Sequence, residues 1–453
     1  MNEISRRSEL RQFLAVFALL FLFYAAWVCA SWPGMLGQDS LAIILEIETD
    51  RSVQANKPAL WFLFNLLLYG TTARAEIPVI VQTLVCVIVC ARILSWLLTR
   101  RMYKSFAYCL FFVALAPSVA LYASSMYSDG VYAIALCGML FEVWRCMRRR
   151  AIDWPSAIML FITIPFAVFA RPNGVINLLA IVILACALSW NQRKYLLLIA
   201  VPWCLAGFGS QALIKYNHPI GSVFPLALYE TVGFLEHRPM GLWEFNEPRV
   251  TPKTIQALTS NGAKIETLQE YYDHYYWDPL IFNPKGPALM ALSKKNRKTI
   301  IKEFFKYNVW HNFPAFAASR VNVFLFSALA RAAMPGPRGA DYILEQTKSV
   351  STRQAFDLPT NEPLLKWFDF SVGVRAIYWA PWLGLWLIGV GALRCARTRD
   401  KAACTVSGIF VLQLAAVFVF SIAGEYRYIL AFFTAPLALL PVLYSPSLQD
   451  NDV

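Results

Sequence analysis

Charged residues are scarce in this chain of 453 residues. Asp, Glu, Lys and Arg together make up 15% of it, against 58% hydrophobic residues and a mean hydropathy of +0.48. Because a typical soluble domain has about 25% charged residues, this composition excludes an ordinary soluble protein. It is typical of a chain that crosses a membrane repeatedly.

Paired cysteines and zinc-binding histidines are also missing from the sequence. All ten cysteines lie in or beside apolar stretches, and none lies in the long hydrophilic region 215–375. This distribution excludes a disulfide framework and a Cys-x-x-Cys metal site. The four histidines all lie in that region without the spacing of zinc ligands, at His218, His237, His274 and His311.

Acidic residues are fewer than basic ones, with 28 Asp and Glu against 41 Lys and Arg, so the formal net charge is +13. Much of the excess lies in short basic segments beside apolar stretches, at 6–11, 100–104, 145–150, 191–194 and 394–401. Cytoplasmic loops of membrane proteins carry such an excess. We therefore interpret the charge as a topology signal and not as a sign of nucleic-acid binding.

Apolar stretches of about 17–25 residues are the unit that crosses a bilayer. The sequence contains ten, at 12–31, 76–98, 105–123, 130–146, 155–170, 174–190, 195–214, 376–394, 402–422 and 427–445. Ten spans place all the basic segments and both termini in the cytoplasm. The first stretch is too long for a signal peptide and no small-residue cleavage site follows it, so we expect it to stay as a span.

The predicted fold class is therefore all-α: a polytopic membrane protein with about ten transmembrane helices, surface helices on the outer face and a large outer loop region. The expected parts are an N-terminal transmembrane module (1–214) with a first outer loop (32–75), a large outer region (215–375) and a C-terminal transmembrane module (376–453). A further apolar stretch at 313–335 is interrupted by Arg320 and Arg331. We expect it to form a helix in the outer interface, or half-inserted, and not an eleventh span.

Unusual polar residues stand at the outer ends of the expected spans. The segment "WPGMLGQDSLAII" (Trp32–Ile44) follows the first span and presents Asp39 after a Pro-Gly break. The apolar stretch "NKPALWFLFNLLLYG" (Asn56–Gly70) is short for a crossing and suits a helix along the membrane surface. The other outer motifs are "SSMYSDG" with Asp129, "RPNG" with Arg171, and "GEYRY" with Arg427 and Tyr428. We expect these pieces to frame a cavity for a lipid with a polar head.

In their order and common sidedness these motifs resemble the GT-C class of integral-membrane glycosyltransferases, which take a sugar from a polyprenyl-phosphate carrier on the outer face. Relatives of this kind include bacterial lipid A aminoarabinose transferases, protein mannosyltransferases and the glucosyltransferases that modify O-antigen. The matching features are Asp39 after the first span, "KPALWFLFNLLLYG" as the family's Lys-Pro helix, Asp129 before the fourth span, and "EYRYILAFFTAPLALLP" at the last one. The resemblance implies a multi-pass protein of the bacterial inner membrane that acts in lipopolysaccharide modification.

The chemistry of such a transfer can also be argued from the residues. Removing the proton of an acceptor hydroxyl requires a base, and a departing phosphate requires cations. A single base acting in one displacement gives inversion. We predict Asp39 as the catalytic base, and the predicted substrate-binding residues are Lys57, Asp129, Arg171, Arg375, Arg427 and Tyr428.

Other roles stay open for several of these residues. Asp39 and Asp129 each suit the start of a helix as a cap, and Lys57 suits a residue that extends to the lipid head groups. A Mg²⁺ or Mn²⁺ ion held by both carboxylates and the donor phosphate is a further alternative, and no other cofactor is expected. The aromatic run "YYDHYYWDPLIF" (Tyr271–Phe282) suits either a sugar-stacking surface or an interfacial belt.

Two other classes of function are alternatives to a glycosyltransferase. A polysaccharide polymerase or ligase would use a lipid-diphosphate glycan and outer-loop Arg and His residues, without an early Asp. A transporter would show inverted repeats and interrupted helices at mid-membrane, and the sequence has no internal repeat. The expected partners are a polyprenyl-phosphate sugar donor, a glycan or lipid acceptor and membrane lipids, and the sugar and acceptor stay open.

Overall fold

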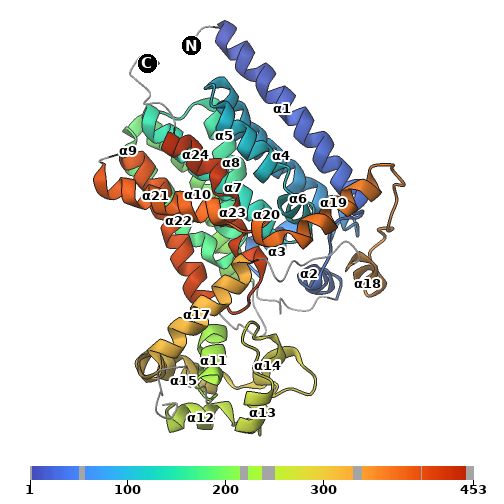
Figure 1. Cartoon of the computed structure of the whole chain (residues 1–453), viewed down its shortest axis with the longest axis vertical. Coiled ribbons are helices and arrows are strands. Elements are labelled where there is room, and N and C mark those ends of the chain that lie inside the picture. Colours follow the sequence, from blue (N-terminus) through green and yellow to red (C-terminus); the bar gives the residue numbers. More distant parts are fainter. Residues whose placement is uncertain are drawn as a thin grey trace. The chain divides into compact units, whose positions relative to one another are not determined.

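The computed structural model describes residues 3–49, 57–214, 223–236, 250–329, 339–398 and 400–444. Within these ranges every regular element is a helix, and strand-like pairing is limited to two isolated bridges, Met35 with Ser125 and Tyr276 with Ala423 (Figure 1). The prediction of an all-α fold is confirmed. The chain forms two compact units, a larger one (Met1–Asn217, Ala333–Leu414 and Arg427–Val453) and a smaller one (His218–Ala332 and Ala415–Tyr426). The predicted outer region 215–375 is thus shared between the two units.

Among the residues that the structure describes, seven helical segments are long and apolar enough to cross a membrane. They are Ser8–Ala30 in α1 (Glu3–Ala30), α4 (Glu76–Thr99), α7 (Ser128–Arg149), α10 (Trp190–Leu213), Arg375–Arg397 with α20 and α21, α22 (Lys401–Phe420), and Tyr426–Tyr444 with α23 and α24. A bent pair, Tyr103–Ala114 and Pro117–Ala123, adds an eighth if it is one span. These segments support a multi-pass membrane protein.

Two of the expected spans fold as shorter helices. Stretch 155–170 forms α8 (Trp154–Phe169), and stretch 174–190 forms the short turn η2 (Pro172–Asn177) followed by α9 (Leu178–Ala187). Stretch 105–123 is bent by 59° before Pro117, because proline lacks the N–H group that would continue the preceding helix. The count of ten crossings stays a prediction.

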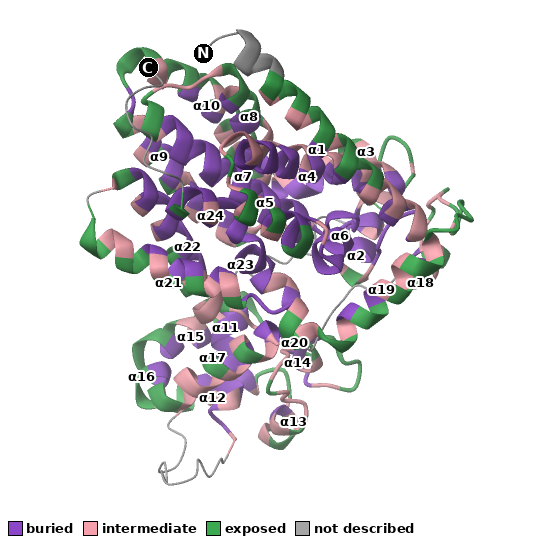
Figure 2. Ribbon diagram, turned by 45° about the horizontal axis from the view of Figure 1, so that its top comes forward, coloured by how far each residue is buried: buried purple, intermediate pink, exposed green. Residues whose placement is uncertain are grey.

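Helix α7 forms the centre of the larger unit, where it packs against α4, α8, α23 and α24 (Figure 2). Every residue from Asp129 to Cys146 is buried. Small residues permit this packing, since a Cβ atom at Gly138 would lie 2.5 Å from a methyl carbon of Val89. A helix that is buried on all sides needs no polar face.

Helices α1 and α10 instead leave apolar side chains exposed. Leu22 of α1 is 67% exposed, and Leu198 and Leu205 of α10 are 75% and 69% exposed. A contiguous apolar surface of this kind is unfavourable in water. It is the surface that a helix presents to lipid.

A buried ion-pair network joins the ends of the helices that the basic loops connect. The Glu142 carboxylate in α7 is fully buried and accepts hydrogen bonds from Arg92 at 2.9 Å, from Arg145 at 2.9 Å and from Ser156 at 2.6 Å. Full pairing of this kind is what makes a buried charge tolerable. Arg148 also pairs with Asp400, so two loops predicted to face the cytoplasm lie together.

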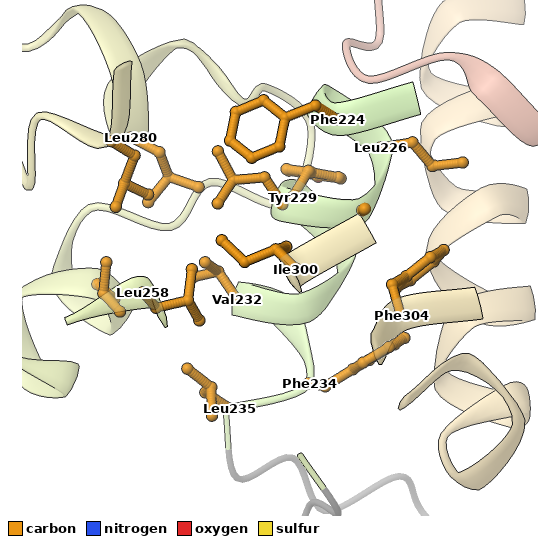
Figure 3. Packing of buried hydrophobic residues seen from close by; sticks show 14 of the residues in the cluster. Phe224, Leu226, Tyr229, Val232, Phe234, Leu235, Leu258, Leu280, Ile300 and Phe304 are labelled. Carbon is orange, nitrogen blue, oxygen red and sulfur yellow. The ribbon is translucent and has the colours of Figure 1, made fainter. Parts of the chain in front are cut away.

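The smaller unit has its own hydrophobic core, formed by α11 (Val223–Gly233), α12 (Pro252–Leu258), α15 (Lys294–Glu303) and their neighbours (Figure 3). Its stretch 313–335 is described as far as residue 329 and forms α17 (Phe313–Ala328), and Arg331 lies outside the described residues. Arg320 of α17 is fully buried and pairs with Glu230. This pairing explains how an arginine fits within an apolar helix.

Candidate functional site

Two loops that are far apart in the sequence are joined by backbone hydrogen bonds. The Met35 N–H donates to the Ser124 carbonyl at 2.9 Å, and the Met126 N–H donates to the Met35 carbonyl at 3.2 Å. Gly34 has a φ of +126°, which favours glycine. The pairing places the segment that follows α1 beside the segment that precedes α7.

Asp39 is the second residue of α2 (Gln38–Glu48), and Gly37 is the N-cap. The Gly37 N–H donates to the Ser40 hydroxyl at 3.2 Å, so the start of the helix is closed without the Asp39 side chain. That side chain, 26% exposed, forms ion pairs with Lys57, at 2.7 Å from Nζ, and with Arg427. The alternative role of Asp39 as the N-cap is therefore not the arrangement in the structure.

Asp129 occupies the matching place in α7, as the second residue after the N-cap Tyr127. It is buried and forms an ion pair with Arg171, which lies between α8 and η2. Both carboxylates thus stand in the first turn of a helix, where the helix dipole favours negative charge. Asp39 is also paired with Lys57 and Arg427, and Asp129 is paired with Arg171.

Aromatic rings connect the two ion pairs. The Arg171 guanidinium lies 5.1 Å from the ring centre of Tyr428, and the Arg427 guanidinium lies 5.4 Å from the same ring. Arg427 also lies 5.5 Å from the ring of Tyr127. Cation–π contacts at these distances are attractive, so the rings hold the two guanidinium groups near one another.

Tyr127 was not predicted as a site residue from the sequence. A Cβ atom at Gly37 would lie 2.3 Å from the Tyr127 hydroxyl, so the ring packs directly on the start of α2. The available signal was its place two residues before Asp129, at a helix start. Sequence alone does not show that the ring reaches Gly37 and Arg427, because these contacts depend on the tertiary packing.

Lys57 is positioned by the start of α3 (Ala59–Leu68), a ten-residue apolar helix as short as expected for this stretch. Pro58 is its N-cap, and the Ala59 N–H donates to the Gln211 side chain of α10 at 3.3 Å. The Lys57 side chain, just before the helix, reaches Asp39 at 2.7 Å. The start of this short helix thus supplies one of the cations that face the carboxylate.

Segment 348–356, which was not predicted to belong to the site, holds α2 in place. The Lys348 N–H donates to both carboxylate oxygens of Glu48 at 2.9 Å, and the Val350 N–H donates to the Ala73 carbonyl at 2.9 Å. Farther along, the ring of Phe356 packs edge-on against Trp32 at 4.9 Å. Segment 348–356 therefore fixes both ends of the loop and helix that carry Asp39.

The charges around Asp39 shift two pKa values. Burial raises the pKa of Asp39, but Lys57 and Arg427 outweigh this effect and hold the pKa below its usual range. Burial lowers the pKa of Lys57, Arg427 and Arg171 lower it further, and Asp39 only partly opposes them. Asp39 is therefore ionised at neutral pH.

The cluster as a whole carries a positive excess. Its three cations, Lys57, Arg171 and Arg427, face two carboxylates, Asp39 and Asp129, so the formal charge of these described residues is 3 − 2 = +1. Asp39, Lys57, Arg171 and Arg427 keep 15–26% of their side-chain surface exposed. Partly exposed guanidinium and ammonium groups of this kind can pair with an anion.

The structure does not bring every predicted residue to the cluster. Arg375, at the start of α20 (Arg375–Tyr378), donates to the Val372 carbonyl at 3.2 Å, and among the described residues it has no ion pair with the cluster. His274 lies 3.8 Å from Glu236 in the smaller unit, and His311 ends α16 (Val309–His311). His218 and His237 lie outside the described residues.

The two carboxylates do not fit a Mg²⁺ or Mn²⁺ site well. Both are engaged by Lys or Arg side chains, whereas Mg²⁺ requires an octahedral set of oxygen ligands. Among the described residues no group of three or more His, Cys, Asp or Glu side chains is suited to a metal. We therefore derive no step through a metal ion.

Comparison with known proteins adds no relative: no protein-family model, no curated protein and no solved structure matches this chain. The features that bear on function are therefore the cluster and the apolar helices whose ends carry it. Asp129, Arg171 and Arg427 stand at the ends of α7, α8 and the last apolar segment.

Proposed function

We propose that this protein is an inverting membrane glycosyltransferase of the GT-C type. It moves a sugar from a polyprenyl-phosphate carrier to a hydroxyl group of a glycan or lipid-linked acceptor, on the outer face of a bacterial inner membrane. The observation that carries the proposal is the ion-pair cluster of Asp39, Lys57 and Arg427 beside Asp129 and Arg171. It combines carboxylates with cations, the groups that we propose as the base and as the binding groups for the donor phosphate.

The positive excess of the cluster favours a lipid phosphate over a lipid diphosphate. A sugar joined to a polyprenyl phosphate is a phosphodiester with one negative charge, which equals the excess of +1. A lipid-diphosphate glycan, the donor of a polymerase or ligase, carries two negative charges and would leave one uncompensated. Arginine suits this role because its planar fork can bind two phosphate oxygens at once.

Asp39 acts as the base in this proposal. The Asp39 carboxylate takes the proton of the acceptor hydroxyl while the hydroxyl oxygen attacks the anomeric carbon of the donor sugar. The bond from that carbon to the phosphate oxygen breaks, and the phosphate leaves with the electron pair. Because one displacement occurs at one carbon, the anomeric configuration inverts.

The ion pairs of Asp39 explain how the donor prepares the base. Without a donor, Lys57 and Arg427 lower the pKa of Asp39, which makes the carboxylate a weak base. A donor phosphate competes for the same two cations and so weakens their hold on the carboxylate. The pKa of Asp39 therefore rises only when the donor is bound. The carboxylate then becomes a stronger base at the step in which it takes the proton of the acceptor hydroxyl.

The second ion pair has a supporting role. Asp129 is buried, so it holds Arg171 in place and does not reach an acceptor. Arg171 and Arg427 both lie against Tyr428, and in this proposal both guanidinium groups bind the phosphate of the donor. Stabilising charge that develops on a leaving group is often the largest contribution to catalysis.

The test is mass spectrometry of cell-surface glycans from cells with and without this gene. A glycosyltransferase of this kind adds one sugar residue, so loss of the gene should remove the mass of a single residue from each decorated unit. A change in the number of repeat units would instead indicate a polymerase. Identical glycan masses in both strains would contradict the proposal.

A further inference from the structure

A buried glutamine lies within one of the candidate membrane spans. Gln413 is 1% exposed and belongs to α22, one of the most apolar helices of the chain. Burying an amide in apolar surroundings is unfavourable unless it is hydrogen-bonded. A polar residue in such a place therefore needs a partner, and polar residues inside spans commonly serve a function.

The partners of Gln413 are both in the segment that follows Arg171. The Gln413 Nε2 group donates to the Asn173 carbonyl at 3.0 Å and to the Asn177 Oδ1 atom at 2.8 Å. The Asn173 Nδ2 group donates back to the Gln413 Oε1 atom at 2.7 Å and to the Tyr132 hydroxyl at 3.2 Å. Helix α22 and helix α7 thus hold the turn η2 from two sides.

The same turn is also fixed against the end of α8. The Asn177 Nδ2 group donates to the Ala167 carbonyl at 2.7 Å, which satisfies one of the free carbonyl groups in the last turn of the helix. A Cβ atom at Gly174 would lie 2.5 Å from the Val168 carbonyl oxygen. Only glycine fits there, so the turn folds directly back onto α8.

Arg171 enters this turn with an extended backbone, with φ −137° and ψ 150°. The backbone position of Arg171 is therefore fixed by α8 before it and by η2 after it. Asn173 is two residues farther on. A displacement of the turn would shift the backbone of Arg171, whose side chain contacts Asp129 and Tyr428.

We propose that Gln413 is a positioning residue that acts through Asn173 and Asn177. It fixes the turn η2, and the turn holds the Arg171 guanidinium between Asp129 and Tyr428, where it binds the phosphate of the donor. The phosphate ligand rests on the function proposed above, whereas the positioning of Arg171 does not.

Binding of a polyprenyl monophosphate, measured by titration into the full-length protein in nanodiscs of zwitterionic lipid, tests the role. Wild-type protein should bind this probe, and Arg171→Ala should weaken binding about 10- to 100-fold, as expected for a lost hydrogen bond to a charged group. Gln413→Leu should weaken it by a similar factor. The double variant should bind no more weakly than Arg171→Ala alone, because both changes remove the same contact.

The matched control is Gln12→Leu, which removes another glutamine from an apolar helix. Gln12 accepts a hydrogen bond from Thr99 at 2.6 Å, and it lies 18 residues before the end of α1 at Ala30, about 27 Å along the helix. The Gln12→Leu variant should bind the probe as tightly as the wild type. The positioning role is overturned if Gln413→Leu binds the probe as tightly as the wild type. It is also overturned if the affinity of the double variant falls by the product of the two single-variant factors.

A second measurement does not depend on any ligand and separates the two proposals. Thermal unfolding of the wild type, the Arg171→Ala and Gln413→Leu variants and the double variant should show that Arg171→Ala lowers Tm in the wild-type background and lowers it much less in the Gln413→Leu background. Equal lowering in both backgrounds overturns the positioning role. Wild-type protein that does not bind the probe, combined with strongly non-additive Tm values, overturns the proposed phosphate ligand and leaves the positioning of Arg171 in place.

Discussion

Asp39 and Arg427 form an ion pair although 388 residues separate them in the chain. Asp39 follows the first apolar helix and Arg427 begins the last apolar segment. Lys57 joins the pair from the start of a third helix. One carboxylate thus links a segment near the start of the sequence to the last apolar segment.

The Asp39 ion pairs predict a specific pH dependence of stability. The pKa of Asp39 is lower in the folded protein than in the unfolded chain, where a carboxyl group titrates near pH 4. Ionised Asp39 therefore stabilises the fold above about pH 4, and this stabilisation is lost as the pH falls through the lower folded-state value. Unfolding in detergent should show wild type more stable than Asp39→Asn by about 1–2 kcal/mol at pH 7, with the gap closing in acid.

A stability gap of the same size at pH 7 and at pH 3 would contradict this account of Asp39. Asp341→Asn is a suitable control because Asp341 pairs with Arg353 and is 45% exposed. An exposed pair contributes little, so this variant should show no comparable gap at either pH.

The contact between Gly37 and Tyr127 predicts a large effect from a single methyl group. Gly37→Ala would place that group 2.3 Å from the present position of the Tyr127 hydroxyl, so the ring must move and lose its contact with Arg427. We expect transfer activity to fall at least about 10-fold, since misplaced binding groups are costly in catalysis. Gly209→Ala is the matched control, because a Cβ atom there meets nothing within 4 Å. Unchanged activity in Gly37→Ala would contradict the role of the contact, whether or not the control loses activity.

Arg427 is expected to bind phosphate with a planar group that lysine cannot replace. Arg427→Ala should raise KM for the lipid-phosphate donor about 10- to 100-fold, the cost of a lost hydrogen bond to a charged group. Arg427→Lys should restore only part of this loss, because lysine keeps the charge but not the fork or the stacking on Tyr428. The control is Arg149→Ala, which removes an arginine that pairs with Asp153 near the other end of α7. Full activity in Arg427→Ala would remove this residue from the site.

Membrane sidedness can be tested with a thiol reagent that does not cross lipid, in a variant without native cysteines. Gln256→Cys in α12 should react from the outer side, and Arg149→Cys should react only after the membrane is opened, because basic loops face the cytoplasm. Both side chains are exposed. Gly424 is a poor site for a label, since a Cβ atom there would lie 2.4 Å from a ring carbon of Phe326. Labelling of both positions from the same side would contradict the predicted topology.

Much of the cluster could be predicted from the sequence for a simple reason. A charged residue at the end of an apolar helix is conspicuous, and the positive-inside pattern shows which ends lie on the same side. Asp39, Asp129, Arg171 and Arg427 all have this signature, and the structure joins them in two linked ion pairs. Arg375 has the same signature but pairs within its own segment, because sidedness does not determine neighbours.

The missed residues are those whose roles depend on packing. Tyr127, Gln413 and Lys348 act through contacts with residues that lie far away in the chain. The sequence predicted a break between the apolar stretches 155–170 and 174–190, but the turn continues to Asn177, four residues into the second stretch. Its extent is set by Pro172, Gly174 and the amide of Asn177, and average hydropathy does not show these contacts.

The most direct test of the account is the transfer rate of Asp39→Asn. The rate can be measured as the gain in mass of acceptor glycans in vesicles that contain the protein and its cell-derived donor. Asparagine keeps the size of the side chain but cannot take the proton, so the rate should fall about 10²- to 10⁴-fold. Binding of polyprenyl monophosphate should be retained, because Lys57 and Arg427 are then free of the competing carboxylate. An Asp39→Asn protein that transfers the sugar at the wild-type rate would contradict the assignment of Asp39 as the base.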